Sequence, residues 1–143
     1  MTRRFWIVLA ALALAGCGAD SAQPPQPGLW EVTRSAGAPS GRQKTSPPTT
    51  MCIRDQGREG DPARRIIVDM IGSSRCKPDK VQVAGGRVSG ALQCPEFYAF
   101  SAHEEPVTGR YSADSVELAV DTPVFGHVLR QSVSAKRIGD CER

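Results

Sequence analysis

The chain has 143 residues with 18 basic and 15 acidic side chains, and 40% of its residues are hydrophobic, which suits one small domain. No stripe of lysine and arginine with interleaved aromatic residues is present, so nucleic acid is not expected as a partner. The composition predicts a modest core that benefits from covalent cross-links.

The N-terminal segment has the parts of an export signal. Arg3 and Arg4 supply positive charge, residues 5–14 are apolar, and small residues precede Cys17. The apolar run is shorter than the ~20 residues of a transmembrane helix. Residues 14–17, Leu-Ala-Gly-Cys, resemble a bacterial lipobox.

That resemblance implies that residues 1–16 are a lipoprotein signal peptide and that Cys17 becomes the lipidated N-terminus. Two or more acyl chains anchor a protein stably, so the membrane is expected as a partner through the lipid on Cys17. Gly18, by analogy with lipoprotein sorting, favours the outer membrane, with the domain facing the periplasm. The alternative is an ordinary cleaved signal with a chance cysteine and a soluble secreted protein. Cleavage also removes Arg3 and Arg4, which leaves 16 basic against 15 acidic side chains.

A proline-rich tether and one domain are predicted after the signal. Residues 17–27 comprise the lipidated cysteine and a tether without apolar periodicity, which spans at most about 30 Å. Residues 28–143 are predicted to form a single disulfide-braced β domain. Its first strand is expected at 29–33, a loop at 35–48 and a second strand at 49–53.

A short helix is predicted at about residues 62–71. Asp61 can cap it, Pro62 suits the first helical position, and Gly72 can end it. Its apolar residues recur at helical spacing on one face: Ala63, Ile66, Ile67, Met70 and Ile71. The β-branched run 66–68 favours a strand as the alternative.

A β-hairpin follows, because Gly85-Gly86 suits a tight turn between two alternating segments. If Ala84 lies opposite Arg87, Cys76 lies opposite position 95, one residue from Cys94. A bulge or a three-residue turn would close that gap, which predicts a Cys76–Cys94 disulfide across the hairpin.

The remaining domain cysteines then form Cys52–Cys141, although the sequence alone permits three connectivities. An even number of cysteines in an exported chain is typical of disulfides. Zinc sites usually present close cysteine pairs, whereas the gaps here are 24, 18 and 47 positions.

The rest of the chain is predicted to be short strands separated by turns. The expected strands are residues 97–102, 107–111, 116–120 and 128–138, with a turn at 112–114. The fold class is therefore mainly β, an antiparallel meander that can curl into an open barrel, with one short helix and two disulfides.

Several short segments resemble the bacterial envelope family known as domain of unknown function 3617. They are Pro27-Gly28-Leu29-Trp30-Glu31-Val32, Thr50-Met51-Cys52, the glycine-rich hairpin between Cys76 and Cys94, Gly109-Arg110-Tyr111 with Asp114, and Arg137-Ile138-Gly139-Asp140-Cys141. The resemblance covers roughly residues 27–141. It implies export and a shared disulfide framework, and it implies no activity.

Catalytic and cofactor motifs are not found in the sequence. His103 beside Glu104-Glu105 is typical of a solvated charge cluster in a turn, and His127 has no local nucleophile motif beside it. The sequence contains no Gly-x-Ser-x-Gly, Gly-x-x-x-x-Gly-Lys or His-Glu-x-x-His pattern. We therefore expect that the protein is not an enzyme and that it binds no metal and no cofactor.

Two functions stay open. The first is a non-catalytic structural or protein-interaction module with an envelope protein or cell-wall partner. The second is a periplasmic carrier of a small apolar ligand. Its pocket would be lined by apolar residues inside the curled sheet: Trp30, Val83, Leu92, Phe100 and Val120. A closed core with an exposed apolar patch favours the module, and an interior cavity favours the carrier.

Overall fold

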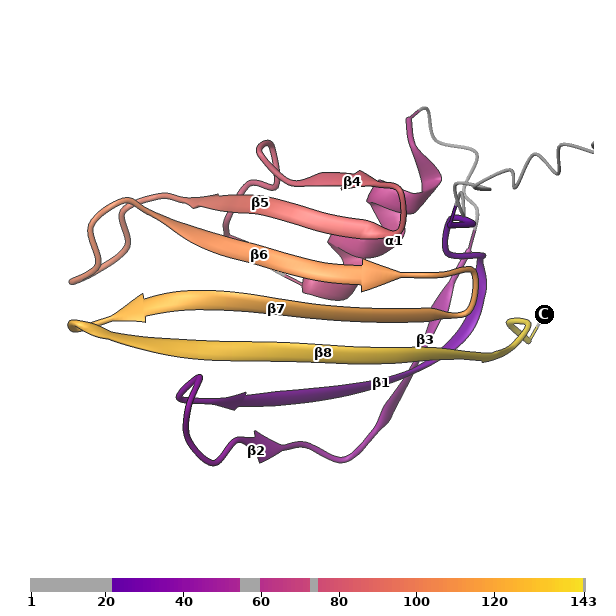
Figure 1. The fold of residues 1–143 in the computed structure, drawn as a ribbon, viewed down its shortest axis with the longest axis horizontal. Coiled ribbons are helices and arrows are strands. Elements are labelled where there is room, and N and C mark those ends of the chain that lie inside the picture. The colour runs from indigo at the N-terminus through magenta and orange to yellow at the C-terminus, as the bar shows by residue number, and fades with distance from the viewer. Residues whose placement is uncertain (1–21, 55–59, 73–74, 143) are drawn as a thin grey trace, which may run out of the picture.

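The computed structural model describes residues 22–54, 60–72 and 75–142. An antiparallel sheet of eight strands and one helix make up these residues (Figure 1). The elements are β1 (Gly28–Gly37), β2 (Lys44–Thr45), β3 (Thr49–Ile53), α1 (Pro62–Ile71), β4 (Gln82–Ala84), β5 (Arg87–Cys94), β6 (His103–Tyr111), β7 (Ser115–Val124) and β8 (His127–Gly139). The strand order is β2-β1-β8-β7-β6-β5-β4, and β3 also pairs with β1. The predicted mainly β, antiparallel fold is confirmed, and the sheet is not closed.

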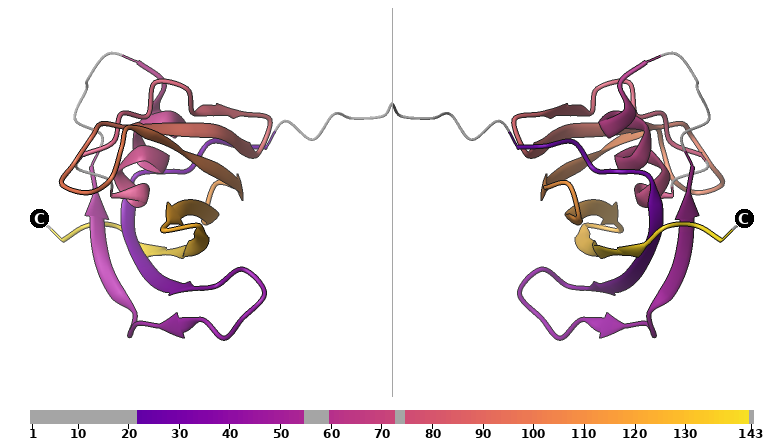
Figure 2. Two further views of the ribbon diagram at one scale, coloured as in Figure 1. Left: turned by 90° about the vertical axis from the view of Figure 1, so that its left-hand side faces the viewer. Right: turned by 90° about the vertical axis from the view of Figure 1, so that its right-hand side faces the viewer.

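The sheet is curved, and α1 lies on its concave side (Figure 2). Ile67 and Met70 of the helix are fully buried against the sheet. Arg34 of β1 donates a hydrogen bond from Nη2 to the backbone oxygen of Met70 at 2.9 Å. This contact satisfies a carbonyl in the last turn of the helix, where no partner is available within the helix itself.

The predicted helix is confirmed with its caps. The Asp61 carboxylate accepts a hydrogen bond from the backbone N–H of Ala63 at 2.9 Å, and Pro62 begins the helix. Gly72 ends it with a φ of 69°, a left-handed conformation that glycine adopts without a steric penalty. The packing of the apolar face thus outweighs the β-branched run.

The predicted hairpin register is also present. Ala84 pairs with Arg87 in the tight turn, whereas Lys77 pairs with Gln93, so the register slips by one residue further from the turn. A turn in which the N–H of Val81 bonds to the carbonyl of Pro78 absorbs the extra residue. Cys76 and Cys94 are consequently opposite one another.

Both disulfides join the pairs that the hairpin geometry predicts. The Cα atoms of Cys76 and Cys94 are 4.2 Å apart, and those of Cys52 and Cys141 are 5.5 Å apart. The second bond ties β3 to the segment that follows β8 across 89 positions of sequence. It therefore fixes the edge of the sheet to the end of the domain.

Two sequence predictions about the strands are wrong in part. The expected loop at 35–48 contains the end of β1 and all of β2, because β1 pairs with β8 as far as Gly37 and Arg130. This long-range pairing cannot be read from a segment rich in glycine, serine and proline.

The expected strand at 97–102 is instead a tight reversal of the chain. Phe97 and Phe100 exchange backbone hydrogen bonds of 2.9 and 3.0 Å, and β6 begins only at His103. Aromatic residues favour strands, but a positive φ at Tyr98 turns the backbone. His103 consequently lies in a strand rather than in the expected turn.

The core lies between the concave face and α1. Its members come from most strands and the helix: Trp30, Val32, Ile53, Ala63, Ile66, Ile67, Met70, Val81, Val88, Leu92, Cys94, Val107, Tyr111, Val116, Leu118, Val120, Val133 and Ala135. Within the described part of the chain, no helix has the length and apolar character needed to cross a membrane.

Candidate functional site

The chain reaches the sheet at one end and packs there before β1 begins. Pro25 is fully buried, and the N–H of Gln26 donates to the carbonyl of Ala113 at 3.0 Å. The indole N–H of Trp30 donates to the carbonyl of Gln26 at 3.1 Å. Pro25 and Gln26, which the sequence places in the tether, are thus part of the folded domain. We call this the tether end.

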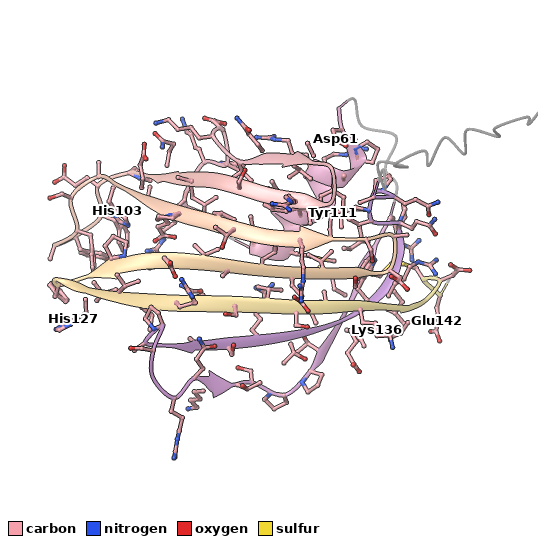
Figure 3. All side chains as sticks on the ribbon, viewed as in Figure 1. Asp61, His103, Tyr111, His127, Lys136 and Glu142 are labelled. Carbon is pink, nitrogen blue, oxygen red and sulfur yellow. A yellow bond between two sulfur atoms is a disulfide. The ribbon has the colours of Figure 1, made fainter. Side chains whose placement is uncertain are left out.

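The opposite end carries exposed aromatic side chains. It is formed by the loop between β5 and β6 and by the turn between β7 and β8 (Figure 1). His103 and His127 lie at this end, and Lys136 and Glu142 lie at the other (Figure 3). We call it the aromatic end and define it by four residues: Phe97, Tyr98, Phe100 and Phe125.

The aromatic side chains of this end contact one another in pairs. The rings of Phe97 and Tyr98 are 4.2 Å apart in a T-shaped arrangement, and those of Phe100 and Phe125 are 5.3 Å apart. Tyr98 is 89% exposed and Phe125 is 76% exposed. Large apolar side chains exposed together are typical of sites that bind another molecule.

The backbone is strained at the two most exposed members. Among the described residues, Tyr98 with a φ of 50° and Phe125 with a φ of 45° are the positive-φ positions that are not glycine. Each such conformation costs of order 1 kcal/mol for a residue with a side chain. Strain of this kind occurs preferentially at binding and catalytic sites. The same two residues thus combine strain with exposure.

A hollow of about 500 Å³ opens beneath the aromatic end. The Cys76–Cys94 disulfide and the side chains of Phe97, Phe100 and Val124 contribute apolar wall. Polar side chains also line the hollow: Arg75, Thr122, His103 and Glu105. The hollow is therefore an apolar recess with a few polar groups, as in many small binding sites.

The charged groups of this hollow contact different partners. The Arg75 guanidinium lies 3.8 Å from the centroid of the Phe97 ring, a cation–π contact. The side chain of Glu105 is 13% exposed, and its Oε1 lies 3.4 Å from Nε2 of His103. His103 Nδ1 lies 2.8 Å from the carbonyl of Ser101. A carbonyl only accepts, so Nδ1 is the nitrogen that carries the proton when the ring is neutral.

Glu105 also lies near both sulfur atoms of the adjacent disulfide. The sulfurs of Cys76 and Cys94 and a carboxylate oxygen of Glu105 fall within 4.8 Å of one another. Because the two sulfurs are bonded to each other, neither is a thiolate, which is the form that binds metal. As folded, this cluster is a wall of the hollow and not a metal centre.

An ion pair braces the strands that carry Phe125. Arg130 of β8 donates from Nε and Nη2 to the two carboxylate oxygens of Asp121 in β7, both at 2.7 Å. These hydrogen bonds from Arg130 hold the pKa of the Asp121 carboxyl below its usual range. Asp121 lies four positions before Phe125, and Arg130 lies four positions after Gly126, so the pair joins the two strands close to this turn.

Replacing Asp121 by asparagine is expected to lower the free energy of unfolding at pH 7 by no more than about 1 kcal/mol, because the pair is partly exposed. The folded pKa of Asp121 is lowered, so its contribution is present above the unfolded pKa of about 3.9. It is lost as the pH falls through the folded pKa. Denaturant unfolding at pH 7 and near pH 2 should therefore show the difference shrink at low pH. A pH-independent difference would contradict this assignment.

The residues expected to line an interior pocket lie elsewhere. Trp30, Leu92 and Val120 are buried in the packed core, and Val83 packs against that core. Phe100 lines the hollow at the aromatic end. The apolar recess is thus at the end of the sheet and not inside its curve, which α1 fills.

Cys17, the predicted lipidation site, lies outside the described residues, whereas both histidines are placed by the structure. His103 contacts Glu105, in a strand that lines the hollow, and His127 is exposed at the start of β8. Sequence reasoning missed Phe97, Tyr98 and Phe125 as a surface, because the first two read as strand residues. The Phe125-Gly126 pair before β8 was the available turn signal.

These features define a small open antiparallel sheet with a helix in its concave face, two disulfides and an exposed aromatic end. The family described as "Protein of unknown function (DUF3617)" has a sequence model that matches residues 25–141. The chain belongs to this family. No curated protein and no solved structure matches the chain.

Proposed function

We propose that this protein is an envelope lipoprotein, anchored by lipid on Cys17, whose domain binds a partner protein at the aromatic end and does not catalyse a reaction. The coincidence of exposure and backbone strain at Tyr98 and Phe125 is the observation that carries the proposal. Aromatic side chains are enriched among the residues that dominate protein–protein binding energy. A strained, solvent-exposed aromatic residue destabilises the free domain, so a binding role explains why it is there.

The lengths of the chain segments support an arrangement in which the tether end lies near the bilayer and the aromatic end reaches away from it. The chain lies against the domain from Ala22, whose Cβ is within 2.6 Å of the position that a Cβ on Gly86 would take. Cys17 and Ala22 are joined by a segment that spans at most about 18 Å. β8 has 13 residues, so it runs about 40 Å from the aromatic end toward the tether end. A lipid on Cys17 would hold the tether end near the bilayer and leave the aromatic end free to face the periplasm.

A small apolar ligand is the second candidate, and the hollow of about 500 Å³ favours it. Its walls include Phe97, Phe100 and the Cys76–Cys94 disulfide. The hollow opens among the same residues that form the aromatic end. A ligand and a partner protein would therefore compete for this surface.

Two variants separate anchoring from docking. Metabolic labelling with a fatty acid should mark the wild type and not Cys17→Ala. For docking, the test is the double variant Tyr98→Gly/Phe125→Gly. Glycine adopts positive φ without strain, so we expect this variant to be as stable as the wild type or up to about 2 kcal/mol more stable. It should nevertheless lose any native complex that the wild type forms in gently solubilised envelopes.

The matched control is Ile138→Ser, an exposed apolar residue outside the aromatic end. This control should keep the native size of the complex. Two results would contradict the proposal: a complex that survives in the glycine variant, or wild-type protein that runs as a monomer in envelopes. A monomer that retains a hydrophobic molecule, identified by mass spectrometry, would instead support the carrier.

A further inference from the structure

The hollow beneath the aromatic end contains a carboxylate, that of Glu105, whose ion-pair partner among the described residues is a histidine and not a lysine or an arginine. The side chain of Glu105 is only 13% exposed and lies in a recess that is mainly apolar. The Glu105 carboxylate oxygen Oε1 lies 3.4 Å from Nε2 of His103, which is longer than a normal hydrogen bond. Because Nδ1 of His103 faces the carbonyl of Ser101, the neutral ring has no proton on Nε2 to give to Glu105. A charged group in such surroundings is costly unless it is paired.

The same hollow already accommodates a cation on an aromatic wall. The Arg75 guanidinium is 3.8 Å from the centroid of Phe97. Aromatic faces attract cations through the negative potential of the ring, and the attraction grows when water is excluded. Phe100 offers a second aromatic side chain in the same lining. The recess thus combines aromatic surface, apolar surface and one under-paired carboxylate.

We propose that this hollow receives a lysine side chain of the partner protein, with its ammonium group toward Glu105 and its methylene stem along the apolar wall. Lysine buries its stem on apolar surface while its charged head finds a polar group. Arg75 then acts as an internal competitor, because its positive charge lies in the same recess. The identity of the partner as a protein rests on the proposed function, whereas the chemistry of the hollow does not.

The test uses n-butylammonium as a mimic of the lysine side chain and 1-butanol as its neutral control. Amide chemical shifts of the purified mature domain, lacking residues 1–16, are followed as each compound is added. We expect saturable shifts around the hollow with butylammonium, and binding of butanol that is weaker by about tenfold. Equal binding of the two compounds, or no saturable shift with butylammonium, would overturn the proposal.

Two substitutions should act in opposite directions. Glu105→Gln keeps the size of the side chain and should weaken butylammonium binding by about fivefold to tenfold. Arg75→Ala removes the competing charge and should strengthen it by a few-fold. Thermal unfolding checks that both variants fold, and the comparison of butylammonium with butanol in the wild type needs no variant. Failure of cation binding with an intact docking phenotype at Tyr98 and Phe125 would reject the lysine and leave the proposed function standing.

Discussion

Replacing Trp30 with alanine is expected to lower the free energy of unfolding by about 3–5 kcal/mol. The indole is fully buried in the core, and its N–H donates to the carbonyl of Gln26 at 3.1 Å. The substitution removes the largest buried side chain and leaves that carbonyl without its partner. A domain of this size has about 5–15 kcal/mol in total, so a large share of its stability depends on this side chain.

Urea unfolding followed by far-ultraviolet circular dichroism measures this loss. Ile138→Ala serves as the control, because that side chain is 49% exposed and should change the stability by less than about 1 kcal/mol. A loss of under 1 kcal/mol for Trp30→Ala would show that the indole does not anchor the core.

Removal of the Cys52–Cys141 disulfide is expected to cost about 4–5 kcal/mol if chain entropy dominates, because the bond closes a loop across 89 positions. The bond fastens β3, which pairs with β1 at the edge of the sheet, to the end of the chain. The double variant Cys52→Ala/Cys141→Ala avoids an unpaired thiol. We therefore expect it to unfold at a much lower urea concentration than the wild type.

The Cys76–Cys94 disulfide provides an internal comparison. It closes a loop across only 18 positions, for which the same argument gives about 3 kcal/mol. Cys76→Ala/Cys94→Ala should therefore destabilise the domain less than removal of the longer link. Cys94 is buried, so a part of its effect comes from packing. The reverse order would mean that strain or packing, and not loop length, decides the contribution of each bond.

Local signals in the sequence were sufficient for the helix and the hairpin. Asp61, Pro62 and Gly72 mark the ends of α1 through their own backbone and capping chemistry. Gly85-Gly86 fixes the pairing of β4 with β5, and a slip of one residue beyond β4 then brings the two cysteines opposite one another. These features depend on residues that lie close together in the chain.

Features that depend on distant partners were not predictable in the same way. The length of β1 is set by β8, and the two strands are about a hundred residues apart in the sequence. Pro25 is buried next to Gln26, which bonds to Ala113 in the distant turn between β6 and β7, so its segment reads locally as a tether. The aromatic end combines Phe97 and Tyr98 with Phe125 from another turn, and a single-sequence pattern does not show that these two turns lie at the same end of the molecule.

Site-specific photo-crosslinking in intact cells tests most directly whether this protein docks through its aromatic end. A photoreactive residue is placed in turn at Tyr98, at Phe125 and, as a control at the tether end, at Lys136. We predict a discrete adduct with one protein from positions 98 and 125 but not from 136, and its loss when Phe97 is also changed to serine. Equal adducts from all three positions, or none from 98 and 125, would contradict docking by the aromatic end.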